Sequence, residues 1–224
     1  MKWKDCPVKQ LRANDTVTFR CQRCGACCRN LREAVMMESL DAYRIARYLR
    51  TQGHPAIEVA DVFDHFTTPV ILPGDYPIFM IDTTGADDTC VFLKDGACSI
   101  YPARPRVCRL YPFTADTGER GRDFVWHQCL ERPFHFTGGT VRVKDWFYEN
   151  LTKEDRMFVQ LESESLPIIG ECLHALKGDE LETAQKMICL LRYCLYDVEE
   201  PFLPQYRRNS EQLVYRLLQA VGGL

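Results

Sequence analysis

The sequence predicts an α+β protein that is mainly helical, with a small β-hairpin close to a group of cysteines and a helical C-terminal region. Apolar residues recur at helical spacing in several segments, whereas one Asp-Gly pair stands between two short apolar runs, as in a hairpin. Most of the 12 cysteines fall before residue 130. We therefore expect a cysteine-rich domain over residues 1–140, and helices over residues 141–224 that pack on it.

Two helices are predicted between the cysteine groups. The first begins at Ser39, a good capping residue, and ends before Gly53. The second begins near Pro55, because proline suits the first turn of a helix. Both have apolar residues at helical spacing. The residues expected to face inward are Ala42, Ile45, Ala46 and Leu49 in the first helix, and Val59, Val62, Phe63 and Phe66 in the second.

Strands are predicted after these helices. Residues 77–81, with the sequence PIFMI, predict a short buried strand. Residues 89–101 predict a hairpin whose turn is Asp95-Gly96, because the glycine supplies the position with positive φ. Residues 136–140 are interpreted as a turn.

The C-terminal region predicts helices throughout. Thr152 and Asp155 form a capping pattern that opens one helix, and helical spacing resumes after Pro167. A last helix is expected after Asn209. Between them, one apolar stripe joins Leu181, Ala184, Ile188, Leu191 and Leu195.

Composition excludes several classes of protein. A hydrophobic fraction of 46% supplies a core and excludes general disorder. The net charge of -3 argues against a surface built for nucleic acid. No apolar run approaches the roughly 18 residues of a membrane-spanning helix, and the N-terminal segment lacks the apolar stretch of a secretory signal. We therefore expect a cytoplasmic protein whose thiols stay reduced, which favours metal or redox chemistry over disulfides.

The strongest local signal is the run Cys21-Gln-Arg-Cys24-Gly-Ala-Cys27-Cys28. A C-x2-C loop delivers two thiolates to a metal, and C-x2-C-x2-C extends this to three ligands of an iron–sulfur cluster. In a loop, Cys21, Cys24 and Cys27 would converge, whereas a helix would bring Cys21 and Cys24 together with Cys28. Adjacent side chains such as Cys27 and Cys28 should diverge. Either one is then spare, or the thiols serve more than one metal.

A second group of cysteines extends this set. Cys90, Cys98 and Cys108 lie on the predicted hairpin and in the proline-rich segment after it, and Cys129 is a weaker eighth member. The candidate metal ligands are Cys21, Cys24, Cys27, Cys28, Cys90, Cys98, Cys108 and Cys129.

Arginines without neighbouring acids surround both groups. Arg23 lies in the first, and Arg104 and Arg109 lie in the second. Guanidinium groups would offset the negative charge of a four-thiolate centre and tune its potential, so we expect these three arginines to contact the cofactor. Two other interpretations remain open, namely ordinary surface charge and the binding of an anionic substrate or phosphate.

These motifs resemble the cysteine-cluster family of YkgJ type, which is described as a zinc- or iron-chelating domain. The family pattern combines C-x2-C-x2-C-C with later segments of the forms C-x-F-L, C-x-I-Y and R-P-x-x-C-R-x-Y/F-P. This sequence has all four, at residues 21–28, 90–93, 98–101 and 104–112. The resemblance covers roughly residues 19–130 and implies a metal-binding module, often called an iron–sulfur oxidoreductase. A similar module in flagellin lysine N-methylases implies a further link to methyl transfer.

The remaining cysteines are interpreted differently. Cys172 and Cys194 are expected in the core, and Cys189 is expected to be partly exposed on a more polar helix face. Cys6 is not expected to be a ligand. His127, two residues before Cys129, could supply a nitrogen ligand, but an ordinary histidine is favoured.

Two hypotheses for function follow. The first is an iron–sulfur protein, of [4Fe–4S] type, that serves electron transfer or acts as the cofactor domain of a redox or methyl-transfer enzyme. The alternative is a zinc-binding structural or chelating module without catalysis of its own. Either protein would have a metal ion or cluster as its ligand and a redox or protein partner, with no membrane and no nucleic acid. Thiolate number alone does not choose between the two metals.

Overall fold

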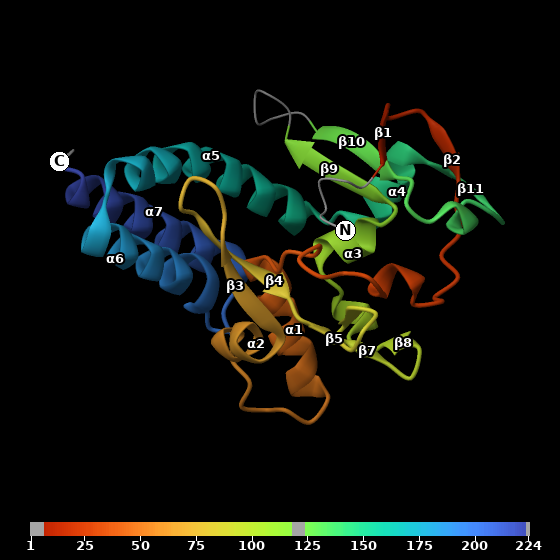
Figure 1. Ribbon diagram of the computed structural model, residues 1–224, viewed down its shortest axis with the longest axis horizontal. Helices are drawn as coiled ribbons and strands as arrows, with labels where there is room; N and C mark the ends of the chain where they lie inside the picture. Colours follow the sequence, from red (N-terminus) through yellow and green to blue (C-terminus); the bar gives the residue numbers. More distant parts are fainter. Residues whose placement is uncertain (1–6, 118–123, 223–224) are drawn as a thin grey trace. The chain divides into compact units, whose positions relative to one another are not determined.

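A computed structural model describes residues 7–117 and 124–222 of the chain (Figure 1). The predicted fold class is confirmed: the protein is α+β, with helices dominant and strands gathered into small sheets. The chain divides into two compact units. Unit 1 comprises Met1–Val35 and Ile81–Arg156, and unit 2 comprises Met36–Met80 and Met157–Leu224. The boundary that the sequence predicts, at residue 140, falls inside unit 1.

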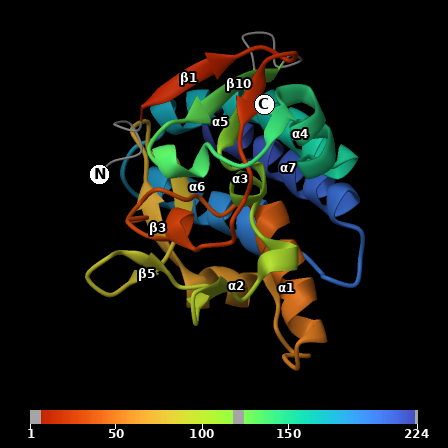
Figure 2. The same ribbon diagram turned by 90° about the vertical axis from the view of Figure 1, so that its right-hand side faces the viewer.

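Unit 1 holds the cysteine motifs and most of the strands. Its antiparallel sheet has the order β1-β10-β9, with β1 beside β10 (Figure 2), and β2 pairs with β11. Two further strand pairs are β5-β6 and β7-β8. Its strands are β1 (Val8–Leu11), β2 (Thr16–Thr18), β5 (Thr83–Thr84), β6 (Thr89–Cys90), β7 (Leu93–Lys94), β8 (Ala97–Cys98), β9 (Phe113–Thr117), β10 (Phe124–Cys129) and β11 (Thr140–Arg142). Its helices are η2 (Ala26–Cys28), η3 (Tyr101–Ala103), α3 (Arg106–Leu110), η4 (Pro133–His135) and α4 (Val143–Asn150).

Unit 2 is chiefly helical and carries one strand pair, β3-β4. Helix α5 begins in unit 1 and runs on into unit 2, where α6 and α7 lie side by side (Figure 1). The elements are α1 (Ser39–Thr51), α2 (Val59–Phe66), β3 (Thr67–Ile71), β4 (Pro77–Ile81), α5 (Lys153–Ala175), α6 (Gly178–Ile188), the π-helix η5 (Cys189–Cys194) and α7 (Phe202–Ala220).

An aromatic core holds unit 1 together. Phe19 lies at its centre, with its ring edge-on to Trp146 at a centroid distance of 5.3 Å and to Phe113 at 6.4 Å. The other buried members are Leu11, Val17, Leu110, Val143, Phe147 and Leu151. Leu11 and Val17 come from strands near the N-terminus, and Val143 begins α4. Both segments thus pack against Leu110 and Phe113, which follow Cys108.

Several local predictions are confirmed. Helix α1 begins at Ser39, although Glu38 and not Ser39 is its N-cap, and β4 is buried along its whole length. Of the predicted inward face of α1, Ala42, Ile45 and Ala46 are buried and Leu49 is half-buried. The hairpin turn is Asp95-Gly96, with φ values of 49° and 77° between β7 and β8. The capping pattern at α5 is also present, because the Thr152 hydroxyl accepts from Asp155 N–H, and Thr152 N–H donates to the Asp155 carboxylate.

Helix boundaries differ from the prediction in three places. Helix α2 begins at Val59, after a capping box between Glu58 and Asp61. Helix α5 continues through Pro167, since buried apolar residues on both sides of the proline hold the two halves in place. Helix α7 begins at Phe202, because the Asn209 amide donates to the Leu195 carbonyl instead of capping the helix.

Among the described residues, seven strands occur where the sequence indicates none, namely β1, β2, β3, β5, β9, β10 and β11. The sequence predicts a turn at residues 136–140, and the structure has bends there until β11 begins at Thr140. The predicted hairpin over residues 89–101 is also smaller than expected, because Cys90 pairs with Thr83 rather than with its own second strand. Strand β11 pairs with β2, which is distant in the sequence, and β6 pairs with β5 in the loop just before it.

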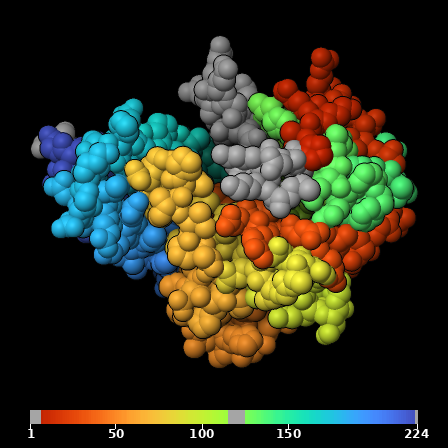
Figure 3. All heavy atoms as spheres, in the orientation of Figure 1, coloured from red at the N-terminus to blue at the C-terminus, as the bar shows by residue number. Residues whose placement is uncertain are grey.

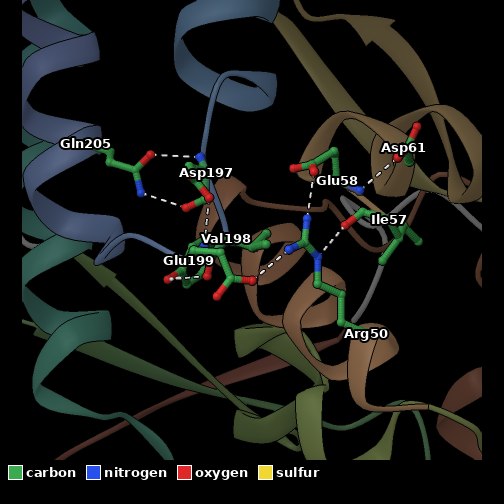
Figure 4. A network of polar contacts seen from close by, with 9 residues as sticks. Arg50, Ile57, Glu58, Asp61, Asp197, Val198, Glu199 and Gln205 are labelled. Carbon is green, nitrogen blue, oxygen red and sulfur yellow. Dashed lines mark hydrogen bonds and ion pairs between the residues drawn. The ribbon is translucent and has the colours of Figure 1, made fainter. Parts of the chain in front are cut away.

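A polar network joins the loops of unit 2 (Figure 4). Arg50 donates to Glu58 at 2.6 Å, to Glu199 at 2.7 Å and to the Ile57 carbonyl at 2.9 Å. The buried Gln205 amide accepts from Asp197 N–H at 2.8 Å and donates to the Asp197 carbonyl at 2.9 Å. The loop between η5 and α7 is thus held by side chains.

Replacing Gln205 by methionine is expected to lower the free energy of unfolding by about 1–3 kcal/mol, because the Asp197 backbone groups lose the hydrogen bonds to the buried Gln205 amide. Urea denaturation followed by circular dichroism measures it. Gln219→Met is the control on the same helix: Gln219 is exposed and donates to the Tyr215 hydroxyl. A loss for Gln205→Met no larger than for Gln219→Met would contradict this role.

Across residues 7–117 and 124–222, no helix is both long and apolar enough to cross a membrane.

Candidate metal centre

Five thiols of unit 1 are linked to one another by a chain of electrostatic interactions. They come from the turn η2, the strands β6 and β8, and the helix α3, and we call them the thiol cluster: Cys27, Cys28, Cys90, Cys98 and Cys108. Cys28 interacts with Cys27, Cys90 and Cys108, and Cys98 interacts with Cys27. The fold therefore assembles members of all four predicted motifs, although they are spread over about 80 residues of chain.

Gly25 brings the first motif onto the hairpin. Its φ is +68°, a left-handed conformation that side chains other than glycine adopt at a cost. A Cβ atom at this position would lie 3.0 Å from Leu93 Cδ1 and 3.3 Å from the Gly96 carbonyl oxygen. The glycine of the CxxCGxCC run thus permits both the turn and the close approach to the strands that carry Cys98.

We expect Gly25→Ala to weaken metal retention, because the methyl group would push the loop away from the hairpin. The matched control is Gly85→Ala, since Gly85 has a φ of +72° and open space around it. Both substitutions should cost about 1–2 kcal/mol of stability through the backbone. Only Gly25→Ala should release metal faster to a chelator, as measured by metal analysis after dialysis. Equal metal release by the two variants would contradict the packing argument.

Cys27 and Cys28 do not diverge as expected. The Cys28 thiol hydrogen-bonds to Cys27, and this bond, together with the charges of Arg104 and Arg132, lowers the pKa of Cys27 to about 7. The same bond, burial and the nearby thiols raise the pKa of Cys28. Burial raises the pKa values of Cys90 and Cys98. The hydrogen bond from Cys28 thus favours a thiolate at Cys27.

Two of the three predicted arginines lie on one aromatic ring beside the cluster. The Arg104 guanidinium carbon is 3.7 Å from the centroid of the Tyr101 ring, and that of Arg23 is 4.5 Å away. Arg104 also acts on Cys27 and Cys98. Stacking on Tyr101 thus holds the positive charge of Arg104 near the thiols. The sequence did not single out Arg132, which also acts on Cys27.

Arg109 is placed differently. Its guanidinium forms a two-point ion pair with the fully buried Asp155, at 2.8 and 3.1 Å. Its other bonds go to the carbonyls of Asn150 and Arg104. The structure thus gives Arg109 the role of an anchor between α3 and the start of α5. Its predicted contact with the cofactor stays a prediction.

A histidine that the sequence did not indicate contacts Cys24. His135 is buried, its Nε2 lies 3.4 Å from Cys24 Sγ, and its Nδ1 lies 2.8 Å from the Tyr111 hydroxyl. Burial, followed by the charge of Arg132, lowers the pKa of His135. A neutral imidazole results, which bonds to both neighbours. The Pro133–His135 turn carries no metal-binding motif. Only the folded structure shows that His135 lies next to Cys24.

The other candidates are less closely tied to the thiol cluster. Cys21 is exposed, and Cys129, at the end of β10, acts on Tyr111. Cys172 is buried, as predicted, and Cys189 is partly exposed, as predicted. The expectation of a core position for Cys194 is wrong, because the π-helix leaves it half-buried. Cys6 lies outside the described residues.

The donor set of this region suits a metal that prefers sulfur. Within the described parts of the chain, no three side chains of His, Cys, Asp or Glu already stand in a metal-holding arrangement. Ligation would therefore draw the thiols together as they lose their protons. The loop position of Cys24 and Cys27, both exposed, allows such a shift. The nearby guanidinium groups fit the negative charge of a thiolate centre.

Comparison with known proteins agrees with this donor chemistry. Residues 20–130 match the family model CxxCxxCC, described as "Putative zinc- or iron-chelating domain". The matched range contains the thiol cluster and ends before His135. No curated protein and no solved structure matches the chain. Through residues 20–130, the chain belongs to the CxxCxxCC family of zinc- or iron-chelating, cysteine-rich domains.

Proposed function

We propose that the cysteine-rich module holds an iron–sulfur cluster, of [4Fe–4S] type, and serves electron transfer or the redox or methyl-transfer chemistry of a larger system. The observation that carries the proposal is the set of five thiols linked by electrostatic interactions, with Arg104 and Arg132 acting on one of them. Four thiolates hold such a cluster, and three of them commonly come from a C-x2-C-x2-C run.

The residues of this chain have distinct parts in the proposal. Cys24 and Cys27 would bind from the exposed loop, and thiols of the hairpin and α3 would complete the set. The two guanidinium groups near Cys27 would offset the charge of the thiolates, and Tyr101 would orient one of them. When bound, an iron–sulfur cluster accepts and releases single electrons at a potential set by its surroundings.

Zinc is the second candidate, since the family description names both metals. A closed four-thiolate zinc site has no redox role and contributes folding energy instead. The thiol cluster would suit it equally, so metal analysis distinguishes the two.

Anaerobic purification tests the proposal. A brown protein with equal amounts of iron and acid-labile sulfide is expected, and Cys27→Ser should lose most of both. Cys172→Ser is the control, because Cys172 is buried in unit 2. A colourless protein with full zinc occupancy would overturn the proposal in favour of the second candidate. In that case Cys24→Ser should lower the temperature at which the module unfolds. Neither the variant nor the wild type should then show the absorption of an iron–sulfur cluster.

A further inference from the structure

The π-helix η5, at the end of α6, changes which side chains share a face. Leu195 N–H donates to the Leu190 carbonyl at 2.9 Å, a bond that spans five residues. In an α-helix, two residues five apart point about 140° away from each other. A π turn is wider than an α turn, so residues five apart point much closer to the same side. Cys189 and Cys194, at the two ends of η5, therefore lie on one side of it.

Both thiols line one hollow of unit 2, which has a volume of 440 Å³. The hollow lies between the β3–β4 hairpin and the segment formed by α6 and η5, which are neighbours in Figure 3 (gold and blue). The Gln185 amide joins the two walls by donating to the Asp75 carbonyl at 2.9 Å. The rest of the lining is largely apolar and comprises Pro69, Ile71, Pro77 and Leu190.

The other polar side chains of the hollow already have partners. Glu182 and Lys186 form an ion pair at 2.7 Å, and Gln185 is held by the hairpin. Cys189 and Cys194 are thus two half-buried sulfur donors on a mainly carbon surface. They interact electrostatically, since Cys189 acts on Cys194, and both lie outside the range of the metal-chelating family.

We propose that Cys189 and Cys194 form a two-thiolate site for a soft monovalent cation of the Cu(I) class. Cu(I) prefers soft thiolate ligands and is satisfied by two of them, whereas zinc requires four ligands. On binding, each S–H bond breaks and its proton passes to the solvent, while two Cu–S bonds form. Copper keeps its +1 state, so no oxidant is needed. The product has a charge of −1, and Lys186, which is paired with Glu182, lies on the wall of the hollow.

Burial lowers the reactivity of these two thiols toward disulfides and peroxides. Burial raises the pKa of Cys194 to about 11, and it also raises the pKa of Cys189. Few thiolates are then present at neutral pH to attack a disulfide or a peroxide. A cation that binds both sulfurs replaces the protons directly.

Protection from alkylation tests the site in the full-length protein. The protein is used as purified, with any metal in the cysteine-rich module left in place. It is titrated anaerobically with Cu(I) and then treated with iodoacetamide. Trypsin separates the two cysteines, because Arg192 lies between them: Cys189 falls in residues 187–192 and Cys194 in residues 193–207. Mass spectrometry thus reads each thiol separately from those of the module. We expect alkylation of both to slow at least about tenfold, because a metal-bound thiolate is no longer a free nucleophile.

The variants decide whether the two sulfurs act together. In Cys189→Ser, Cu(I) should no longer protect Cys194, and in Cys194→Ser it should no longer protect Cys189. Cys172→Ser should retain protection of both, and Zn(II) should protect neither. Absence of protection, equal protection by Zn(II), or protection of one thiol without the other would overturn the proposal. A Cys189–Cys194 disulfide formed by oxidised glutathione while Cu(I) gives no protection would also overturn it. Iron content of Cys189→Ser equal to that of the wild type would separate this site from the proposed cluster.

Discussion

Asp155→Asn is expected to lower the free energy of unfolding by about 3–5 kcal/mol, because it leaves the Arg109 charge without its buried counter-ion. Asp155 is fully buried and accepts four hydrogen bonds. Two come from Arg109, and two come from the amide and hydroxyl of Thr152. A neutral amide of the same size would present an N–H group to some of these donors. Because asparagine has nearly the same size as aspartate, the loss of stability would measure the contribution of the Asp155 charge and its hydrogen bonds.

Urea denaturation of Asp155→Asn and Asp145→Asn measures the effect. Asp145 also forms an ion pair with an arginine, Arg142, at 2.8 Å, but both side chains are about half exposed. Such a pair contributes about 0–1 kcal/mol. Similar losses for the two variants would refute the buried anchor. The double variant Arg109→Met/Asp155→Leu should be more stable than Asp155→Asn, since it removes both charges together.

Arg109→Lys separates the anchor from a general need for positive charge beside Cys108. Lysine keeps the positive charge but lacks the planar guanidinium group. That group donates two hydrogen bonds to Asp155 and one each to two carbonyls. We expect a loss of about 1–3 kcal/mol in stability. Metal content at low denaturant should stay that of the wild type. A stable Arg109→Lys variant that loses its metal would instead favour the direct role near the cofactor that the sequence predicts.

Local features were predictable from the sequence, because their causes are local. The Asp95-Gly96 turn, the start of α1 at Ser39 and the capping bonds at Thr152 each depend on residues within four positions. The cysteine motifs are equally local, so their number and order were readable. Their grouping was not, because it depends on how Gly25 packs against the hairpin.

Features that depend on distant partners were missed. Strand β1 pairs with β10, more than a hundred residues later, and nothing in the sequence of Val8–Leu11 selects that partner. His135 reaches Cys24 across 111 positions. The π-helix was missed for another reason: Leu181 to Leu195 fit α-helical spacing, and only the Leu190 to Leu195 hydrogen bond shows that the helix widens.

His135→Phe is expected to lower the metal affinity of the module by about 10–100-fold, because hydrogen-bond partners of metal ligands orient and tune them. The reason lies in the direction of the bonds. A metal-bound Cys24 thiolate has no proton to give, so His135 Nε2–H must donate to it. His135 Nδ1 must then accept from the Tyr111 hydroxyl, 2.8 Å away. Burial raises the pKa of Tyr111, which keeps that hydroxyl protonated and able to donate.

Competition with a chelator of known affinity measures the change in metal affinity. His135→Gln should recover part of the affinity, because its amide can donate to sulfur. Tyr111→Phe should produce a smaller loss than His135→Phe. If the metal is a cluster, the reduction potential of His135→Phe should become more negative, since hydrogen bonds to the sulfurs stabilise the extra electron. A purely structural role for the ring would leave that potential unchanged. His174→Phe, at an exposed position of α5, is the control. A wild-type affinity and potential in His135→Phe would contradict the chain of hydrogen-bond donors from Tyr111 to Cys24.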